Sequence, residues 1–295
     1  MPPAKDSPSS HSFDAIGTAW EIRSATALES SVLEEVAGLI DAFDHTWSRF
    51  RDDSLVSDIA RTSGEYPLPP EAGPLFDFYR SLYDISTGRI TPLVGRALEA
   101  LGYDRTYSLQ PEPGPAPRIP SWDEAFSFKD GILSAPKPVL LDIGAAGKGL
   151  LVDMVLMHLV RRGHDRVVVD ASGDLRRCDA PGSLERVGLE NPLNPTLAIG
   201  VAEIGSEALG ASGVTKRTWA TGIHHVLDGV TGLPTRGVLA SWVVAPNAMV
   251  ADGIATALLI MDPAPFAETY DIQWVTMAEN GSVRHSDGFR GEIFS

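Results

Sequence analysis

A glycine-rich segment near the middle of the chain has the residue types of a phosphate-binding turn. The sequence LDIGAAGKGLLVD spans residues 141–153 and places Lys148 in the first turn of a predicted helix, after four small residues. Free backbone N–H groups at a helix start, together with a lysine, favour a phosphate. The spacing is not that of a Walker A loop, because Gly149 follows the lysine, nor is it GxGxxG. Taken alone, the segment fits a strand-to-helix turn without a ligand equally well.

A second segment, VADGIATALLIM (250–261), carries two oxygen-bearing side chains at helical spacing. Asp252 and Thr256 are four residues apart, so they share one face of a predicted helix. One carboxylate and one hydroxyl are too few for a complete protein cage, but Mg²⁺ commonly completes its octahedron with water and phosphate oxygens. The alternative, which the segment alone favours, is that Asp252 caps the start of the helix.

The third segment, residues 208–234, is rich in small and hydroxyl residues and contains two adjacent histidines, His224 and His225. Neighbouring residues of a strand point to opposite faces, so this pair is not expected to bind one metal together. One histidine could act as a base or donate to a phosphate oxygen, because imidazole titrates near neutrality. The alternative is a polar hairpin with surface histidines.

Composition limits the possible partners of the chain. Its 295 residues include 43% hydrophobic and 21% charged residues, which allows a packed core, and the net charge is −15. An acidic surface repels nucleic acid and anionic membranes, so we expect neither as a partner. The single cysteine, Cys178, excludes an internal disulfide and any cysteine-rich metal site. Without a recognisable export signal or membrane segment, the sequence indicates a cytoplasmic protein.

The order of predicted elements indicates an α+β fold with mixed or antiparallel sheets and flanking helices, because helices and strands do not alternate strictly. Residues 1–12 are expected to be a disordered leader and residues 13–295 a single domain. Helices are predicted over 28–43, 70–86, 93–101, 148–162 and 249–261. Strands are predicted over 13–22, 138–144, 166–170, 195–202, 208–212, 238–245 and 272–277, with a hairpin at 126–134.

Seven segments, taken together and in order, resemble the ApbE family of FAD:protein FMN transferases. FDAIGTAW resembles the opening F-x-x-M-G-T segment, TWSRFRDDSLVSDIAR the S-x-[YF] segment, and STGRITPLVG the G-x-F-D-P-T-V-G segment. LDIGAAGKG is similar to D-L-G-x-x-A-K-G, and VVVDASGDL to a strand that ends in G-G-D. IHHVLDGVTGLP and VADGIATA resemble the H-[IV]-[IL]-D-P-x-T-G-x-P and A-D-x-x-A-T-A segments.

The resemblance implies a reaction in which Mg²⁺ and FAD bind, FMN moves to a Ser or Thr hydroxyl of an acceptor flavoprotein, and AMP leaves. It implies a metal site made by the side chains of Asp252 and Thr256 and the backbone carbonyl of Ala145. It places His225 beside the diphosphate as the catalytic residue, acting either as a base or as a donor. The implied cofactor-binding residues are Ile16, Phe50, Arg89, Ile90, Thr91, Asp142, Lys148, Val226 and Asp228.

The sequence departs from the family pattern at Thr91, which replaces an aspartate, and at Leu93, which replaces a threonine. Two other functions stay open beside the transferase, and these departures motivate the second of them. An FAD pyrophosphatase would use water in place of the acceptor hydroxyl and release FMN and AMP. A flavin-binding protein would bind FAD without catalysis.

Overall fold

The centre of the molecule is an antiparallel sheet of eight strands. The structure, a computed structural model, describes residues 9–220 and 222–294. The sheet has the strand order β1-β2-β6-β7-β10-β13-β14-β15, and each neighbouring pair runs antiparallel. Its strands are β1 (Ser9–Ala15), β2 (Thr18–Ser24), β6 (Val167–Asp170), β7 (Leu175–Cys178), β10 (Ala208–Gly213), β13 (Val238–Ala245), β14 (Gln273–Ala278) and β15 (Val283–His285).

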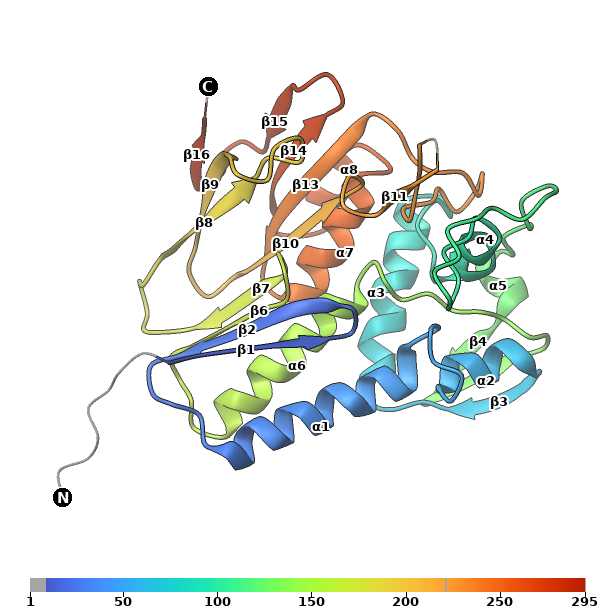
Figure 1. The fold of residues 1–295 in the computed structure, drawn as a ribbon, viewed down its shortest axis with the longest axis horizontal. Helices are drawn as coiled ribbons and strands as arrows, with labels where there is room; N and C mark the ends of the chain where they lie inside the picture. Colours follow the sequence, from blue (N-terminus) through green and yellow to red (C-terminus); the bar gives the residue numbers. More distant parts are fainter. Residues whose placement is uncertain (1–8, 221, 295) are drawn as a thin grey trace.

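Helices cover one face of this sheet (Figure 1). α6 (Gly147–Arg161) packs on β6 and β7, α7 (Ala248–Leu258) packs on β10 and β13, and α1 (Ser30–Trp47) lies outside α6. The apolar residues of α1 recur at helical spacing and are buried, which gives the helix one face for the core. The side chain of Asn247 accepts a hydrogen bond from the backbone N–H of Val250 and so starts α7.

The opposite face of the sheet carries a second, smaller core. β8 (Glu185–Glu190), β9 (Ala198–Ile204) and β16 (Gly291–Ile293) form a three-stranded sheet. Leu189 and Ile204 of this small sheet pack with Trp242 and Val275 of the large one. The large sheet is therefore the middle layer between helices and strands.

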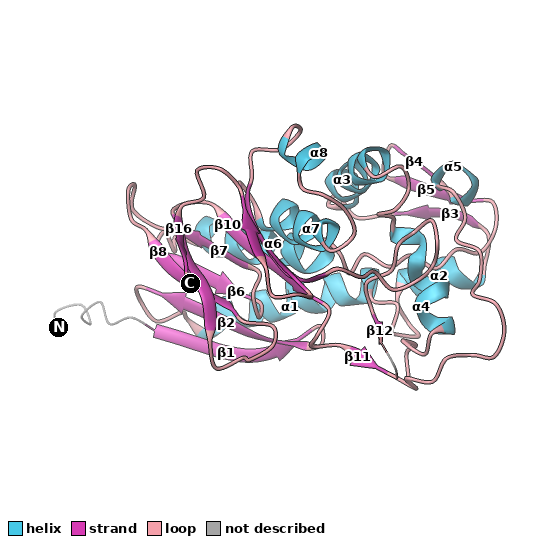
Figure 2. Cartoon of the chain, turned by 90° about the horizontal axis from the view of Figure 1, so that it is seen from above, coloured by secondary structure: helices cyan, strands magenta, loops and turns pink. Residues whose placement is uncertain are grey.

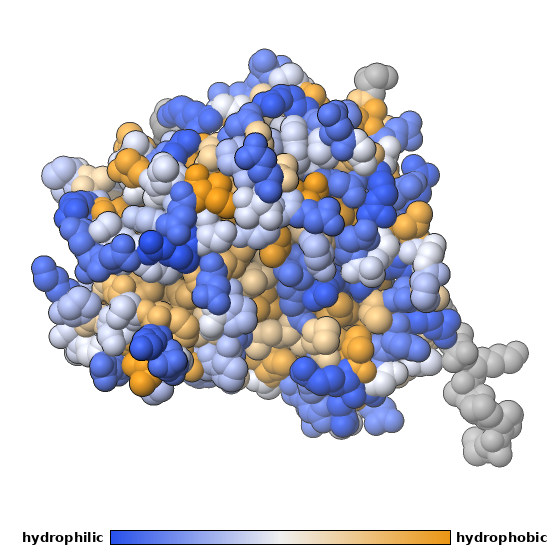
Figure 3. All heavy atoms as spheres, turned by 180° about the vertical axis from the view of Figure 1, so that it is seen from behind, coloured by the Kyte–Doolittle hydropathy of each residue, from blue (hydrophilic) through white to orange (hydrophobic). Residues whose placement is uncertain are grey.

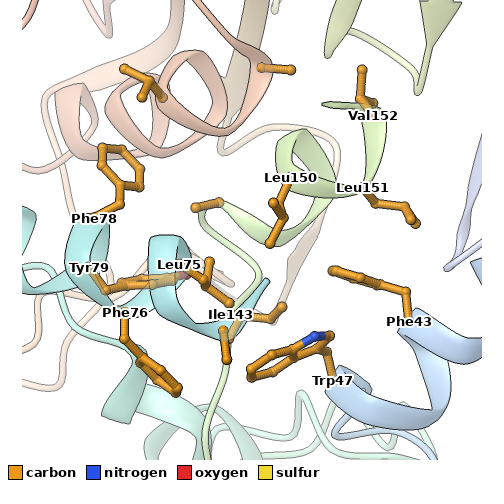
Figure 4. Packing of buried hydrophobic residues seen from close by; sticks show 14 of the residues in the cluster. Phe43, Trp47, Leu75, Phe76, Phe78, Tyr79, Ile143, Leu150, Leu151 and Val152 are labelled. Carbon is orange, nitrogen blue, oxygen red and sulfur yellow. The ribbon is translucent and has the colours of Figure 1, made fainter. Parts of the chain in front are cut away.

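The remaining elements lie outside the layers described so far, most of them beyond the ends of α1 and α6, as Figure 2 shows. They are α2 (Leu55–Arg61), α3 (Ala72–Ile85), the 3₁₀ turn η1 (Pro92–Val94), α4 (Gly95–Ala100), α5 (Trp122–Ala125), α8 (Ala264–Ala267), and the short strands β3 (Gly64–Pro67), β4 (Ser127–Lys129), β5 (Ile132–Ala135), β11 (Thr218–Trp219) and β12 (Ile223–His224). Phe43 and Trp47 of α1 meet Leu150 and Leu151 of α6 and Phe76 of α3 in one apolar cluster (Figure 4).

The α+β prediction is confirmed, and its sheets are antiparallel throughout the described residues. The predicted strand at 138–144 is wrong. This segment is largely buried, but it belongs to no sheet: Val139 N–H donates to Ile59 O of α2, and Asp142 N–H donates to Pro92 O of η1. An apolar run shows that a segment is buried but not which partner its backbone meets.

The N-terminal prediction also needs correction. Residues 1–8 of the predicted leader lie outside the described residues, but residues 9–12 belong to strand β1. The single strand predicted over 13–22 is instead the turn of a hairpin and parts of both its strands. Ile16 and Gly17 form this turn with φ values of 45° and 75°, a left-handed pair that suits the twist of a hairpin.

None of the helices in the described residues is long and apolar enough to cross a membrane. Figure 3 shows hydrophilic side chains over much of the rear face, interrupted by scattered apolar patches. A mixed surface of this kind is ordinary for a folded domain.

Candidate functional site

One cavity collects most of the residues that the sequence singled out. Its volume is about 710 Å³, and it lies where the β1–β2 turn, the end of α1, the start of α6 and one side of α7 converge. The predicted site residues that line it are Ile16, Phe50, Ile90, Thr91, Asp142, Ala145, Lys148, His225, Val226, Asp252 and Thr256. Segments that are distant in sequence thus meet in a space of the size of a small-molecule site.

Asp252 and Thr256 lie one turn apart on α7, and both line this cavity. Asp252 is only 3% exposed, and its Oδ2 accepts a hydrogen bond from the backbone N–H of Gly149 at 2.9 Å. Burial raises the pKa of Asp252 to about 6, while the nearby charge of Lys148 acts in the opposite direction. The alternative reading of Asp252 as a helix cap is wrong, because Asn247 caps α7 and Asp252 lies within it.

The donor set fits a hard divalent cation. A buried carboxylate is costly without a compensating positive charge, and Asp252 Oδ1 accepts no hydrogen bond from the described residues. The hydroxyl of Thr256 lies one turn further along the helix, and Ala145 lines the same cavity. Within residues 9–220 and 222–294, no three His, Cys, Asp or Glu side chains gather as a metal-holding group, so further ligands must come from carbonyls, water or the substrate.

Lys148 is held at the start of α6 by an acidic partner that the sequence reading missed. Its ammonium pairs with the carboxylate of Asp174, which is fully buried and lies immediately before β7. The Asp174 Oδ1 atom also accepts the backbone N–H of Ala211 at 3.1 Å. Burial lowers the pKa of Lys148. The lysine is therefore fixed in direction while about a quarter of its side chain stays open to the cavity, at 23% exposure.

The two histidines have different surroundings. The Nε2 atom of His224 lies 2.9 Å from the carbonyl oxygen of Thr235, and this ring is buried in the structure away from the cavity lining. His225 lines the cavity, and its Nδ1 is buried without a hydrogen-bond partner among the described residues. Burial, reinforced by the positive charge of Arg217, lowers the pKa of His225 to about 4. Its imidazole is therefore neutral near pH 7.

The other end of the cavity is aromatic and contains a buried ion pair. Arg49 Nε donates to Asp142 Oδ2 at 2.6 Å, and the guanidinium lies 4.2 Å from the centre of the Phe50 ring. Asp142 Oδ1 accepts the backbone N–H of Gly144. The ring of Tyr107 stacks on Phe50 at 5.1 Å with an angle of 4° between the planes. Stacked aromatic rings at a cavity wall suit a flat heterocycle.

Two predicted cofactor-binding residues are not brought into the cavity lining. Arg89 Nε donates to Asp228 Oδ2 at 2.7 Å, so these side chains bind each other. Asp228 Oδ1 also accepts the backbone N–H groups of Val230 and Thr231. Direct contact with a cofactor is thus not supported for either residue, whereas the expectation that Asp228 shapes its turn agrees with these hydrogen bonds. Thr91 lines the cavity and caps η1 through its hydroxyl.

Four residues of the site were not singled out from the sequence: Arg49, Asp174, Ser212 and Arg217. Each lies in a segment that the sequence analysis singled out for other residues. Each is held at the site by an ion pair or hydrogen bond with a side chain far along the chain. Arg217, for example, lines the cavity and donates to the hydroxyl of Tyr103 at 3.2 Å. Cationic residues outnumber acidic ones in the cavity lining, although the whole chain carries −15.

The chain is similar in sequence to known proteins of one family. The profile of the ApbE family matches residues 16–274. An FAD:protein FMN transferase of Rhodobacter capsulatus is 27% identical over 270 residues, which cover 85% of this chain and 51% of that protein. One of Treponema pallidum (strain Nichols) is 25% identical over 258 residues, which cover 78% and 71% of the two chains. The chain thus spans about half the length of the first relative.

Solved structures share the fold. The ApbE protein of Thermotoga maritima superposes with a TM-score of 0.84 at 22% identity, covering 95% of this chain and 97% of that one. The flavin transferase ApbE of Vibrio cholerae gives a TM-score of 0.77 at 20% identity, covering 95% and 96%. At these identities, the likeness establishes the architecture, and the function has to be argued from the site.

Proposed function

The chain belongs to the ApbE family, and we propose that it is an Mg²⁺-dependent enzyme that transfers FMN from FAD to a Ser or Thr hydroxyl of an acceptor flavoprotein, releasing AMP. Relatives from several bacteria carry the name FAD:protein FMN transferase. The observation that carries the proposal is the joining of three parts in one cavity: an aromatic wall, a set of cations, and the Asp252–Thr256 pair. A dinucleotide offers a matching ring, diphosphate and metal-binding oxygens.

The metal would be held by the carboxylate of Asp252, the hydroxyl of Thr256 and the carbonyl of Ala145. When bound, Mg²⁺ supplies positive charge that offsets the negative charge on the diphosphate and on the departing AMP. Gly149 holds one oxygen of Asp252 through its backbone N–H, which leaves the other oxygen for the metal.

Lys148 gives the second positive charge at the diphosphate. Its pairing with Asp174 fixes the ammonium beside the cavity, so the charge is in place before the substrate arrives. Pre-positioned charge stabilises a phosphoryl-transfer transition state without reorganisation during the reaction. Arg217 lies in the same wall and adds to this local excess of positive charge.

His225 has the protonation state of a proton acceptor. A lowered pKa of about 4 keeps its ring neutral, and a bound diphosphate beside the ring would raise that pKa toward neutrality. In the proposed step, the acceptor hydroxyl oxygen bonds to the phosphorus of the FMN half, and the bond from that phosphorus to the AMP oxygen breaks. The hydroxyl proton goes to His225, and AMP carries away the electron pair of the broken bond.

The test is to incubate the protein with FAD, Mg²⁺ and a candidate acceptor flavoprotein, and to weigh the acceptor by mass spectrometry. The proposal predicts an acceptor heavier by one FMN moiety, with AMP in solution. Formation of free FMN and AMP without an acceptor would identify a pyrophosphatase instead. Tight FAD binding that is independent of Mg²⁺, with no turnover, would identify a binding protein.

Two variants make the assay specific for the site. Asp252→Asn removes the charged metal ligand with almost no change of shape and should abolish transfer. Asp77→Asn makes the same chemical change on the exposed face of α3 and should leave transfer unchanged. The cytoplasmic location and the lack of a nucleic-acid partner stay predictions from the sequence, and cell fractionation tests the first.

A further inference from the structure

The hydroxyl of Ser212 lies against the proposed metal ligand Thr256. Ser212 is near the end of β10, and its Oγ is 2.7 Å from Oγ1 of Thr256 on α7. Both residues line the cavity. Either oxygen could be the donor in the structure as it stands, so the direction of this hydrogen bond depends on what else binds Thr256.

The backbone around Ser212 brings strand and helix unusually close. A Cβ atom at Gly210 would lie 2.4 Å from the carbonyl carbon of Ala251 and 2.5 Å from the backbone nitrogen of Asp252. Only glycine allows this approach of β10 to α7. Because the two elements are so near, a side chain as short as serine reaches Thr256 across the gap.

The chemistry of a hydroxyl ligand decides the direction of the bond. A threonine hydroxyl has one proton and two lone pairs, and it binds a cation through a lone pair. Its proton must then point away from the metal. Within a helix, a threonine usually donates to the carbonyl four residues earlier. In the described residues, the side chain of Thr256 instead bonds to Ser212, so a cation bound to Thr256 would leave Ser212 as the acceptor of the Thr256 proton.

We propose that Ser212 is a positioning residue for the metal site: it accepts the Thr256 proton, fixes the side-chain rotamer, and turns the free lone pair of Thr256 Oγ1 into the cavity. This inference rests on the proposed function, because it presumes that Thr256 binds the metal. Partners that orient a metal ligand commonly change metal affinity 10- to 100-fold when they are removed.

The β10–β13 pair supplies a matched control for this proposal. Ser241 on β13 stands directly opposite Ser212 in the strand register. Its hydroxyl also bonds to α7, but it donates to the backbone carbonyl of Ala255 at 2.5 Å and is fully buried. Ser241→Ala therefore removes a hydrogen bond of the same kind, between the same strand pair and the same helix, without touching a proposed ligand.

The experiment measures Mn²⁺ affinity by electron paramagnetic resonance with FAD present and no acceptor protein. Ser212→Ala should weaken Mn²⁺ binding about tenfold or more. Ser212→Thr keeps the hydroxyl and should bind Mn²⁺ much more tightly than Ser212→Ala. Ser241→Ala should lower the midpoint of thermal unfolding while leaving the Mn²⁺ affinity of the folded protein unchanged.

Two outcomes separate this inference from the proposed function. Unchanged Mn²⁺ affinity in Ser212→Ala, together with lost binding in Asp252→Asn, would overturn the role of Ser212 and leave the metal site standing. Absence of Mn²⁺ binding to the unaltered protein with FAD would overturn both. An equal loss of Mn²⁺ affinity in Ser212→Ala and Ser241→Ala would show that both variants disturb α7 in general. That result would also overturn the role of Ser212.

Discussion

The backbone N–H of Gly149 and the carboxylate of Asp252 are joined by a hydrogen bond of 2.9 Å between two different helices. A Cβ atom at Gly149 would lie 2.1 Å from the carbonyl oxygen of Ala248 and 2.8 Å from Cβ of Asp252. The glycine after Lys148 therefore permits the contact between α6 and α7, and that contact holds one oxygen of the proposed metal ligand in place.

Gly149→Ala should destabilise the protein, because the added methyl group has no room between the helices. Overpacking of this kind costs about 1–3 kcal/mol. The measurement is the free energy of unfolding in urea. Gly38→Ala is the control: Gly38 is exposed within α1 and has no atom within 4 Å of an added Cβ. It should gain up to about 1 kcal/mol from helix propensity. Equal stability of the two variants would contradict this account of the helix contact.

Arg49 and Asp142 should be strongly coupled, because both lie in the cavity wall and the Arg49 side chain is only 2% exposed. Arg49→Met leaves the Asp142 carboxylate without its cation and should cost about 3–5 kcal/mol of stability. Asp142→Asn added to Arg49→Met removes the unpaired charge and should recover part of that loss. Urea unfolding of both single variants and the double variant gives the coupling.

The same variants report on FAD binding. Arg49 lies against the Phe50 ring, so loss of Arg49 should weaken FAD affinity in both the single variant Arg49→Met and the double variant. The double variant should show this weaker affinity although part of its stability is recovered. Calorimetric titration with FAD separates the two effects. An FAD affinity equal to that of the unaltered protein would remove the aromatic end of the cavity from the binding site.

The lowered pKa of His225 predicts how the stability of the protein depends on pH. Its pKa in the folded protein is lowered to about 4, whereas an unfolded histidine has its ordinary pKa of 6.5. Between these values the unfolded chain binds the proton and the folded chain does not, so this histidine lowers stability as pH falls from about 6.5 to about 4. The contribution is at most about 3 kcal/mol, from 1.36 kcal/mol per pKa unit.

His225→Gln removes this titration, so the variant should lose less stability than the unaltered protein when both are acidified through that range. Urea unfolding at several pH values between about 4.5 and 7 gives the difference for each protein. Parallel curves for the two proteins would show that the ring is not buried in its neutral form. His224→Gln should change the pH dependence of stability in the same direction, because burial also lowers the pKa of His224. This ring lies outside the cavity lining, so the variant serves as a comparison away from the site.

Regular spacing made much of the helical part of the structure predictable. The repeat of Val32, Val36 and Ile40 predicts α1, and the four-residue step from Asp252 to Thr256 places both on one face of α7. Both patterns depend only on neighbours along the chain. The strand prediction for 138–144 was wrong because an apolar run carries no information about the distant elements, here α2 and η1, that its backbone meets.

The tertiary partners of the site could not be predicted for the same reason. Arg49 and Asp142 are 93 residues apart, and Ser212 and Thr256 are 44 apart. Nothing local to Arg49 distinguishes it from the half-buried Arg51 that follows soon after. The resemblance to a family directed attention to segments that line one cavity, while the pairing of side chains between segments became visible only in the folded chain.

The claim at the centre of this account is that Asp252 holds a divalent cation against a bound dinucleotide. Calorimetric titration of Mg²⁺ into the protein with saturating FAD tests it directly, using the unaltered protein and Asp252→Asn side by side. The account predicts one Mg²⁺ bound per chain in the unaltered protein and no binding in the variant, with both proteins folded by circular dichroism. Equal Mg²⁺ binding in the two proteins would contradict it.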